Sequence, residues 1–325
     1  MQRTTGRPVP GLEVAVNINP RSIGEAIRWG RLVENHGVAR LGVWDSPVAV
    51  PECWTTLGAL SQRVTQVPLG VSVTNPVTRH PIVTASAVAG LAGQAAAGVF
   101  LGIGTGDSGV YNLGGRAATL RDLREYVRNV RESLARREQR VKVLVAAHGT
   151  RSLELAAEIG DGVIVGLGHS EEVVAAVTAV VGRDAEVWWN TGTITVDEHG
   201  DRAEAAGGWV LASLAHHFTR FGLKTKLVPA EFRPGVERLG ALYDLSRHGR
   251  HTGESKRRYV EAAKSLGVWE YLADRFLVAG TGSEVVKRLE ELSARGVRRL
   301  EIGTANGLDA AAAVLGLISG EAGER

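Results

Sequence analysis

The sequence has a single cysteine, Cys53, and no apolar run near the length of about 18 residues that a membrane-spanning helix needs. One thiol excludes a disulfide within the chain and a zinc site built from several cysteines, so Cys53 is interpreted as a small buried apolar side chain. The opening residues MQRTTGRPVPG lack the apolar core of a secretory signal. We therefore expect a cytoplasmic protein with no membrane contact.

Several catalytic motifs are also missing. Neither H-E-x-x-H nor another ligand spacing typical of a metal site occurs, so we expect no bound metal. No G-x-S-x-G supports a hydrolase. Lysine is scarce, and Lys142 lies at the start of a predicted strand, the wrong end for chemistry, which argues against a Schiff-base aldolase.

The composition is that of an ordinary globular protein, with 44% hydrophobic and 22% charged residues in a chain of 325. The formal net charge is +3, and the basic residues are spread along the chain. The one locally basic segment, residues 247–258, is interpreted as a solvated loop and helix face. We expect no nucleic-acid partner.

Short β-branched or apolar runs alternate with longer helical patterns, which is typical of consecutive βαβ units. Eight parallel strands can close into a barrel that leaves no exposed edge, so we predict an α/β fold of the (β/α)8 TIM-barrel type, with an open doubly wound sheet as the alternative. The predicted strands are Leu12–Asn19, Leu41–Asp45, Leu69–Thr74, Val99–Ile103, Val141–Ala146, Gly162–Gly166, Glu186–Val196 and Arg299–Gly303.

The helices between these strands have recognisable ends. Ser22 and Ser283 are predicted N-caps. Glycines expected at positive φ end four helices, at positions 37, 98, 160 and 296. The predicted helices are Ser22–His36, Pro81–Ala97, Thr119–Arg137, Arg151–Ile159, Ser170–Val181 and Ser283–Arg295.

The alternation fails between Val196 and Leu300, where about a hundred residues replace one ordinary connection. Helical periodicity over Ala203–Gly222 and Ser255–Ala273 predicts a helical insertion at 198–275, between strands seven and eight. Residues 1–325 are treated as one domain. The insertion is a candidate cap or lid for the barrel mouth and, in part, a candidate dimer surface.

Active sites of such barrels lie in the loops that follow the strands. Glycines after strand four would let the backbone approach a flat ligand, and Gly149-Thr150 and Gly168-His169 each precede a predicted helix, where free N–H groups favour phosphate. Residues 104–109 match G-x-G-x-x-G, but a dinucleotide fingerprint should open a helix in the first βαβ unit. We expect Val110–Gly115 to be an extended loop, which argues against that interpretation.

Two carboxylates, Asp45 and Asp107, follow strands two and four. Either could serve as a general acid or base near a substrate or a ring nitrogen. Each could instead only cap its loop by accepting backbone hydrogen bonds.

Four segments, in family order, resemble the coenzyme F420-dependent methylenetetrahydromethanopterin reductases of the bacterial luciferase-like superfamily, and the stretch from the first to the last spans about three quarters of the chain. They are LGVSVTNPVTRHPIVTAS at 69–86, LGIGTGDS at 101–108, AAHGTRSLELAAEIGDGVIV at 146–165 and AGTGSEVVKRLEELSARGVRRLEIG at 279–303. The resemblance implies a barrel with an insertion after strand seven, and a non-proline cis peptide at Ser72-Val73 behind the deazaflavin ring.

The resemblance also implies site residues. Asp45 and Asp107 match the family's acids, and Asn17 stands where the reductases carry a glutamate, so these three are the candidate catalytic residues. Ser46 replaces a histidine common after the strand-two aspartate, so we expect a changed substrate rather than the pterin. The candidate coenzyme-binding residues are Ser72, Val73, Thr74, Asn75, Gly104, Thr105, Gly106, His148, Gly149, Thr150, Gly168 and His169.

The leading hypothesis is an F420-dependent reductase or dehydrogenase that transfers a hydride between the deazaflavin ring and a small organic substrate. The amino-acid composition of the chain is typical of high-GC coding sequences, which suggests a role in specialised metabolism. One alternative is an FMN-dependent two-component monooxygenase that uses O2 and reduced flavin from a partner reductase. Another is a non-catalytic flavin-binding relative. The resemblance also implies a homodimer.

Overall fold

The computed structural model describes residues 9–197, 201–220, 222–245, 253–303 and 307–320. Within these residues, eight strands form a closed barrel in the order β1-β10-β7-β6-β5-β4-β3-β2. The predicted α/β barrel is confirmed. Its strands are β1 (Glu13–Ile18), β2 (Arg40–Val43), β3 (Leu69–Thr74), β4 (Val99–Ile103), β5 (Lys142–Ala147), β6 (Gly162–Val165), β7 (Val187–Thr191) and β10 (Arg299–Gly303).

The chain divides into two compact units. The first comprises residues 14–166 and 178–188, and the second comprises the described parts of 1–13, 167–177 and 189–325. The expectation of one domain over 1–325 stays a prediction. The first unit contains helices α1 (Ile23–Asn35), α2 (Cys53–Ser61), α3 (Pro81–Ala92), α4 (Ser108–Tyr111), α5 (Leu120–Ala135) and α6 (Thr150–Ile159).

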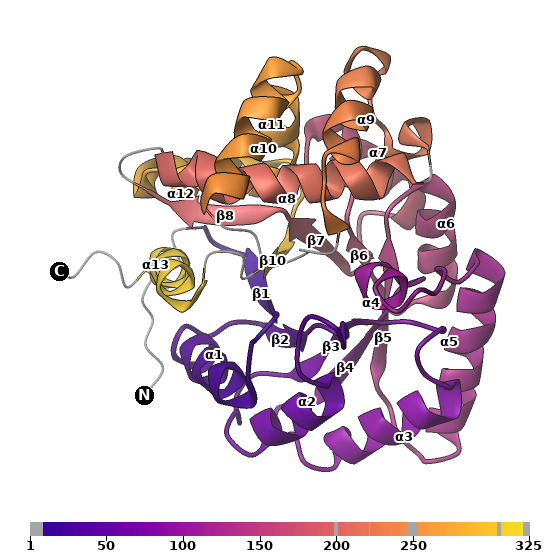
Figure 1. The fold of residues 1–325 in the computed structure, drawn as a ribbon. Helices are drawn as coiled ribbons and strands as arrows, with labels where there is room; N and C mark the ends of the chain where they lie inside the picture. Colours follow the sequence, from indigo (N-terminus) through magenta and orange to yellow (C-terminus); the bar gives the residue numbers. More distant parts are fainter. Residues whose placement is uncertain (1–8, 198–200, 221, 246–252, 304–306, 321–325) are drawn as a thin grey trace. The chain divides into compact units, whose positions relative to one another are not determined.

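The helices of the first unit lie outside its strands, as Figure 1 shows for α1, α2, α3 and α5. Helix α5 illustrates why. Leu123, Tyr126, Val127, Val130 and Leu134 recur at intervals of three or four residues and are buried. The arginines and glutamates between them stay on the outer side, which gives the apolar stripe that a barrel helix needs.

Near the amino-terminal ends of the strands of the first unit, a cation lies between two aromatic rings. The Arg40 guanidinium, at the start of β2, lies 4.6 Å from the ring centre of Phe100 and 4.0 Å from that of Trp188. Arg40 is buried, and Leu144 and Ile164 pack in the same core cluster as the two rings. Cation–π attraction of this kind lets a charged side chain stay in an apolar interior.

Strand β3 is irregular just where the coenzyme-facing segment was predicted. The peptide Ser72–Val73 is cis, as expected. The pairing of β3 with β4 shifts register between Val71 and Thr74. A Cβ atom at Gly102 would lie 2.7 Å from the Val71 carbonyl oxygen, so β4 needs a glycine beside the irregularity.

The second unit carries the helical segments that follow β7. The predicted helices over 203–222 and 255–273 correspond to α8 and to α10 with α11; residues 198–200 and 246–252 lie outside the described residues. The insertion's boundaries and its role as lid or dimer surface stay predictions. The elements are α7 (Glu171–Val181, divided between the units), α8 (Asp201–Thr219), η1 (Leu223–Lys226), η2 (Ala230–Phe232), α9 (Arg233–Ala241), α10 (Gly253–Ser265), α11 (Trp269–Phe276), α12 (Gly282–Ala294) and α13 (Gly307–Ser319).

Several local predictions were wrong. The predicted strand 186–196 is divided into β7 and β8 (Thr193–Val196), and β8 leaves the barrel to pair with β9 (Leu277–Gly280). Thr281, not Ser283, caps α12, because a capping box needs a carboxylate three residues on and Glu284 satisfies that spacing only for Thr281. The predicted helix 81–97 ends at Ala92.

Of the four glycines predicted to end helices, Gly37, Gly98 and Gly296 have positive φ as predicted, but Gly98 lies beyond the end of α3 at Ala92. Gly160 does not, because its φ is −91°. A Cβ atom there would lie 2.7 Å from the carbonyl oxygen of Gly162. Crowding, rather than a left-handed backbone, explains the glycine at that position.

Candidate functional site

The most distinct polar contact of the candidate site joins the ends of two neighbouring strands. The Thr74 hydroxyl, at the end of β3, donates a 2.6 Å hydrogen bond to Oδ2 of Asp45, which follows β2. Thr74 is completely buried. The Asp45 side chain therefore accepts a side-chain hydroxyl, rather than only capping its own loop.

Asn17 lies on β1 and supports β3. Its Nδ2 donates to the carbonyl oxygen of Ser72 at 2.9 Å. Its Oδ1 is buried and has no hydrogen-bond partner among the described residues. A neutral amide cannot carry a catalytic proton, so the geometry favours a positioning role over the predicted catalytic one, which stays a prediction.

The segment after β3 folds around its own asparagine. Oδ1 of Asn75 accepts hydrogen bonds from the backbone N–H groups of Val77 and Thr78, both at 3.0 Å, and from the Thr78 hydroxyl at 3.2 Å. This is an Asx-type turn, in which a side chain takes the place of a backbone acceptor. The predicted coenzyme-binding residue Asn75 thus also fixes the loop that carries Thr78.

The glycine-rich segment after β4 leads into a short helix instead of the extended loop predicted for 110–115. Asp107 is the N-cap of α4, and its carbonyl oxygen accepts hydrogen bonds from the N–H groups of Val110 and Tyr111. A Cβ atom at Gly109 would lie 2.6 Å from the Asp45 carbonyl oxygen. Helix α4 therefore packs directly on the segment after β2, which brings the two predicted acids into one region.

A cavity of about 440 Å3 opens at this end of the first unit. It lies among the loops that follow β2, β3 and β4, where the active site of a barrel is expected. This volume is within the usual range for small-molecule pockets, roughly 300 to 1,000 Å3. The residues lining it are Asp45, Ser46, Pro47, Pro51, Glu52, Cys53, Val77, Thr78, Arg79, Val110, Leu113 and Gly115.

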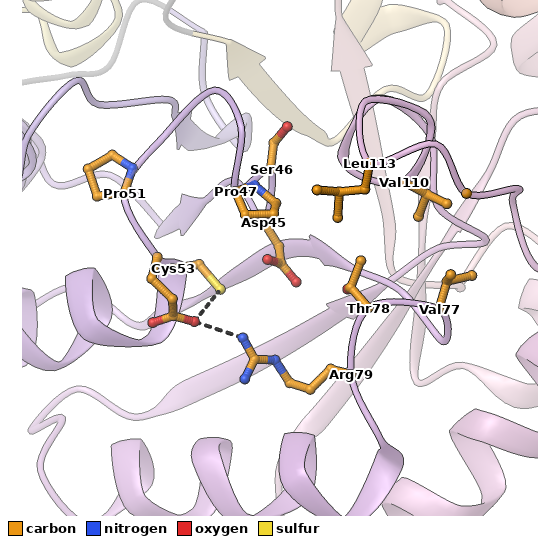
Figure 2. A pocket seen from close by; sticks show the side chains of 12 residues that line it. Asp45, Ser46, Pro47, Pro51, Cys53, Val77, Thr78, Arg79, Val110 and Leu113 are labelled. Atoms are coloured by element: carbon orange, nitrogen blue, oxygen red, sulfur yellow. Dashed lines mark hydrogen bonds and ion pairs between the residues drawn. The ribbon is translucent and has the colours of Figure 1, made fainter.

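Figure 2 places the Asp45 carboxylate, the Cys53 thiol and the Arg79 guanidinium around the same part of the cavity. Nη2 of Arg79 forms a 2.8 Å ion pair with Oε1 of Glu52. The Cys53 thiol points to the same oxygen at 3.8 Å. Burial raises the pKa of Cys53, and the nearby Asp45 and Glu52 carboxylates raise it further, so the thiol stays protonated. Cys53 is buried, as predicted.

The sequence interpretation missed this Glu52–Arg79 pair and helix α2. Glu52 is the N-cap of α2, with its Oε2 accepting a 2.7 Å hydrogen bond from the Thr55 N–H. Proline followed by a polar residue before the run CWTTLGALS was an available helix-start signal. The pairing with Arg79, 27 residues later, depends on the tertiary fold and had no such signal.

The start of α6 is a second predicted coenzyme-binding segment of the first unit. Gly149 is its N-cap, provides no side-chain cap, and is followed by Thr150. The His148 ring lies so close to Gly166 that a Cβ atom there would collide with it. The backbone N–H of His148 donates to the Ser152 hydroxyl at 3.1 Å. This geometry is compatible with anion binding at a helix N-terminus.

Gly168 and His169 belong to the second unit. The His169 N–H donates a 2.9 Å hydrogen bond to the Arg275 carbonyl oxygen. Burial lowers the pKa of His169 to about 3, and Arg288 and Arg295 add to the shift. A fully buried, neutral ring does not offer a charge to a phosphate, so any phosphate contact at this turn would come from the backbone.

No metal site was predicted. Among the described residues, no group of three or more histidine, cysteine or carboxylate side chains lies together as metal ligands would. None of the described helices has the length and hydropathy needed to cross a bilayer.

Comparisons with known proteins identify the family and the fold. Residues 7–299 match the family model described as luciferase-like monooxygenase. The chain is 26% identical, over 289 residues, to the 5,10-methylenetetrahydromethanopterin reductase of Archaeoglobus fulgidus, an alignment that covers 79% of this chain and 82% of that protein.

Two solved structures share the fold. The coenzyme F420-dependent tetrahydromethanopterin reductase from Methanopyrus kandleri superposes with a TM-score of 0.71 at 17% identity, covering 95% of this chain and 97% of that one. The oxygenating constituent of 3,6-diketocamphane monooxygenase from Pseudomonas putida, solved with FMN, gives 0.62 at 15% identity, covering 95% and 97%. With its closed barrel, the acid after β2 and the match over residues 7–299, the chain belongs to the luciferase-like monooxygenase family of enzymes.

Proposed function

We propose that the chain is an F420-dependent oxidoreductase that transfers a hydride between the deazaflavin ring and an organic substrate. One observation carries the proposal: the Asp45 carboxylate, held by the Thr74 hydroxyl at 2.6 Å, lines a cavity at the ends of β2 to β4. The likeness to the coenzyme F420-dependent reductase from Methanopyrus kandleri supports the choice of coenzyme.

The residues at the ends of β3 and β4 fit a flat ring. A Cβ atom at Gly104 would lie 3.1 Å from Cγ2 of Val73 and 3.4 Å from Cβ of Ala146, so only a glycine leaves the surface of these side chains open. The buried Oδ1 of Asn17 and Oγ of Ser46 have no hydrogen-bond partner among the described residues, which suits a ligand with polar edges. When bound, the deazaflavin would accept or supply the hydride.

The chain's own residues would handle the proton and the position of the substrate. The Asp45 carboxylate is the group that would take up or release a proton, because it lines the cavity and can change charge. Thr74 would keep it oriented, and Asn17 would hold β3 through the Ser72 carbonyl. In the first unit, Gly149 and Thr150 would bind an anionic group through backbone N–H groups. In the second unit, Gly168 is the candidate for such a contact, because the His169 N–H is already bonded to the Arg275 carbonyl oxygen.

The FMN-dependent monooxygenase is the second candidate, favoured by the structural likeness to a protein solved with FMN. It would require a partner reductase to supply reduced flavin and would depend on O2. A non-catalytic flavin-binding protein would bind coenzyme without turnover. The homodimer, the cytoplasmic location and the role in specialised metabolism belong to the proposal as well.

Titration with F420 and separately with FMN, followed by fluorescence quenching at matched ionic strength, tests the coenzyme assignment. We expect micromolar or tighter binding of F420 and weak binding of FMN. The reverse preference would favour the monooxygenase, and binding of neither coenzyme would reject both proposals.

A matched pair of variants locates the ring. Gly104→Ala fills the space beside Val73, whereas Gly90→Ala, on α3, meets no atom within 4 Å. We expect F420 affinity to fall about tenfold in the first variant and to stay unchanged in the second, as loss of about 1.4 kcal/mol of binding implies. Equal affinities in both variants, with both folded, would place the ring elsewhere.

A further inference from the structure

We propose that the cavity beside Asp45 takes an uncharged, largely apolar molecule that presents one hydroxyl group to the Asp45 carboxylate, and that it excludes anions. The inference rests on the proposed function only in treating this cavity as the substrate side. It concerns the charge and polarity of the molecule that binds.

The walls of the cavity are mostly apolar. Pro47 and Pro51 come from the loop after β2, Val77 from the loop after β3, and Val110 and Leu113 from α4 and the residues after it. Val77 is 46% exposed and Leu113 56% exposed, which is unusual for such side chains. Covering them with an apolar ligand would remove this surface from water, which favours binding.

The charges of the cavity disfavour an anion. Its lining includes the carboxylates of Asp45 and Glu52 and the guanidinium of Arg79, which leaves one net negative charge. The guanidinium is already paired with Glu52 at 2.8 Å. An anionic group would therefore meet the Asp45 carboxylate with no unengaged cation among the lining residues to offset the repulsion.

Several backbone donors around the cavity are also occupied. The N–H groups of Val77 and Thr78 are taken by Asn75, and that of Thr55, at the start of α2, is taken by Glu52. The N–H of Val110 is bonded to the Asp107 carbonyl oxygen. An incoming carboxylate or phosphate could not use these N–H groups without breaking their bonds and would rely on side-chain donors such as the Ser46 hydroxyl, whereas a hydroxyl group can donate directly to Asp45.

A cation is disfavoured for a different reason. Figure 2 shows the Asp45 carboxylate and the Arg79 guanidinium on the same cavity. An ammonium group beside Asp45 would lose its hydration among the apolar walls, a cost that a neutral hydroxyl group largely avoids.

Three probes with one ring system test the proposal: 2-naphthylmethanol, 2-naphthoate and 2-naphthylmethylammonium, measured by isothermal titration calorimetry on the full chain. We expect the alcohol to bind at least about tenfold more tightly than either charged probe. Equal or tighter binding of the carboxylate or of the ammonium would overturn the proposal.

Glu52→Gln sharpens the test. The substitution releases Arg79 from its ion pair and removes the net negative charge, while the amide oxygen can still accept from the Thr55 N–H. We expect 2-naphthoate affinity to rise about tenfold and the affinity for the alcohol to change less than about threefold. An unchanged affinity for the carboxylate would show that the pair does not control charge selection.

Leu113→Lys adds a cation at the cavity and should also favour the carboxylate. Leu242→Lys is its control, because Leu242 is similarly exposed but does not line the cavity.

If saturating F420 abolishes binding of 2-naphthylmethanol, the cavity belongs to the coenzyme and this inference is wrong, although the proposed function stands. If F420 does not bind but the alcohol does, the proposed function fails and the ligand class survives.

Discussion

Thr74 donates a 2.6 Å hydrogen bond from its hydroxyl group to the carboxylate of Asp45. Thr74 is at the end of β3, and Asp45 follows the neighbouring strand β2. A hydrogen bond to a charged group contributes about 1.5 to 3 kcal/mol. We expect Thr74→Val to lower the rate of hydride transfer about tenfold or more, because the carboxylate loses its orientation. Thr74→Ser, which keeps the hydroxyl, should stay within about threefold. Equal losses in both variants would indicate a packing effect, which stopped-flow measurement of coenzyme reduction can distinguish.

The two predicted acids should differ in importance. Asp45 lines the cavity, whereas Asp107 is the N-cap of α4 and is not among the lining residues. We expect Asp45→Asn to lower turnover by about 10²-fold or more, the usual effect of losing a general acid or base. Asp107→Asn should have a smaller effect on turnover. Steady-state kinetics of both folded variants test this, and the opposite order would assign the proton to Asp107.

The buried imidazole of His169 makes stability depend on pH. Its pKa is lowered to about 3 by burial first and by Arg288 and Arg295 next, below the ordinary value of 6.5. Between about pH 6.5 and pH 3, the unfolded chain therefore binds a proton at this histidine that the folded chain does not bind. The free energy of unfolding should not depend on His169 above pH 6.5 and should fall by up to about 1.4 kcal/mol per pH unit as the pH drops between those values.

His169→Gln should make the free energy of unfolding less dependent on pH in that interval, as urea denaturation at pH 7 and pH 5 would measure. His36→Gln is the matched control for loss of a histidine. An identical pH dependence in wild type and His169→Gln would contradict the prediction.

Two glycines with nearly the same backbone φ angle allow the strain of the backbone to be measured apart from a steric clash of the added Cβ atom. Gly168 has φ +86° and Gly182 has φ +87°, both in the left-handed region. A Cβ atom at Gly168 would lie 2.5 Å from the Arg275 carbonyl oxygen, whereas one at Gly182 meets no atom within 4 Å. Gly182→Ala should cost about 1 to 2 kcal/mol from the backbone alone.

Gly168→Ala should cost a further 1 to 3 kcal/mol, roughly, because the turn must move away from Arg275. The difference between the two variants in thermal or urea unfolding measures that contact. A difference near zero would mean that the turn adapts without cost.

Much of the barrel was predictable because its strands are short apolar runs between turn residues. The strands 69–74, 99–103 and 299–303 were predicted with their observed bounds. The run 186–196 was not divided although Gly192 interrupts it, because the contact that fixes the bend, from the Gly192 N–H to the Phe276 carbonyl oxygen, lies far along the chain.

The site was predictable to the extent that topology fixes it. A residue that follows a parallel strand lies at the carboxyl end of the barrel, so Asp45 was identified from its position. Thr74 was a candidate through the family resemblance. The ion pair between Glu52 and Arg79 was not predicted, because the sequence does not show which loops lie in contact. The charge balance of the cavity depends on this ion pair.

Arg40 begins β2 and Asp45 follows its other end, and this separation has a consequence for how the enzyme can change. The Arg40 cation, between Phe100 and Trp188, maintains the packing of the core, and none of these three residues is among those that line the cavity. Libraries that vary Val77, Val110 and Leu113 can therefore explore new substrates without weakening the scaffold, which makes the same barrel a suitable starting point for redirected catalysis.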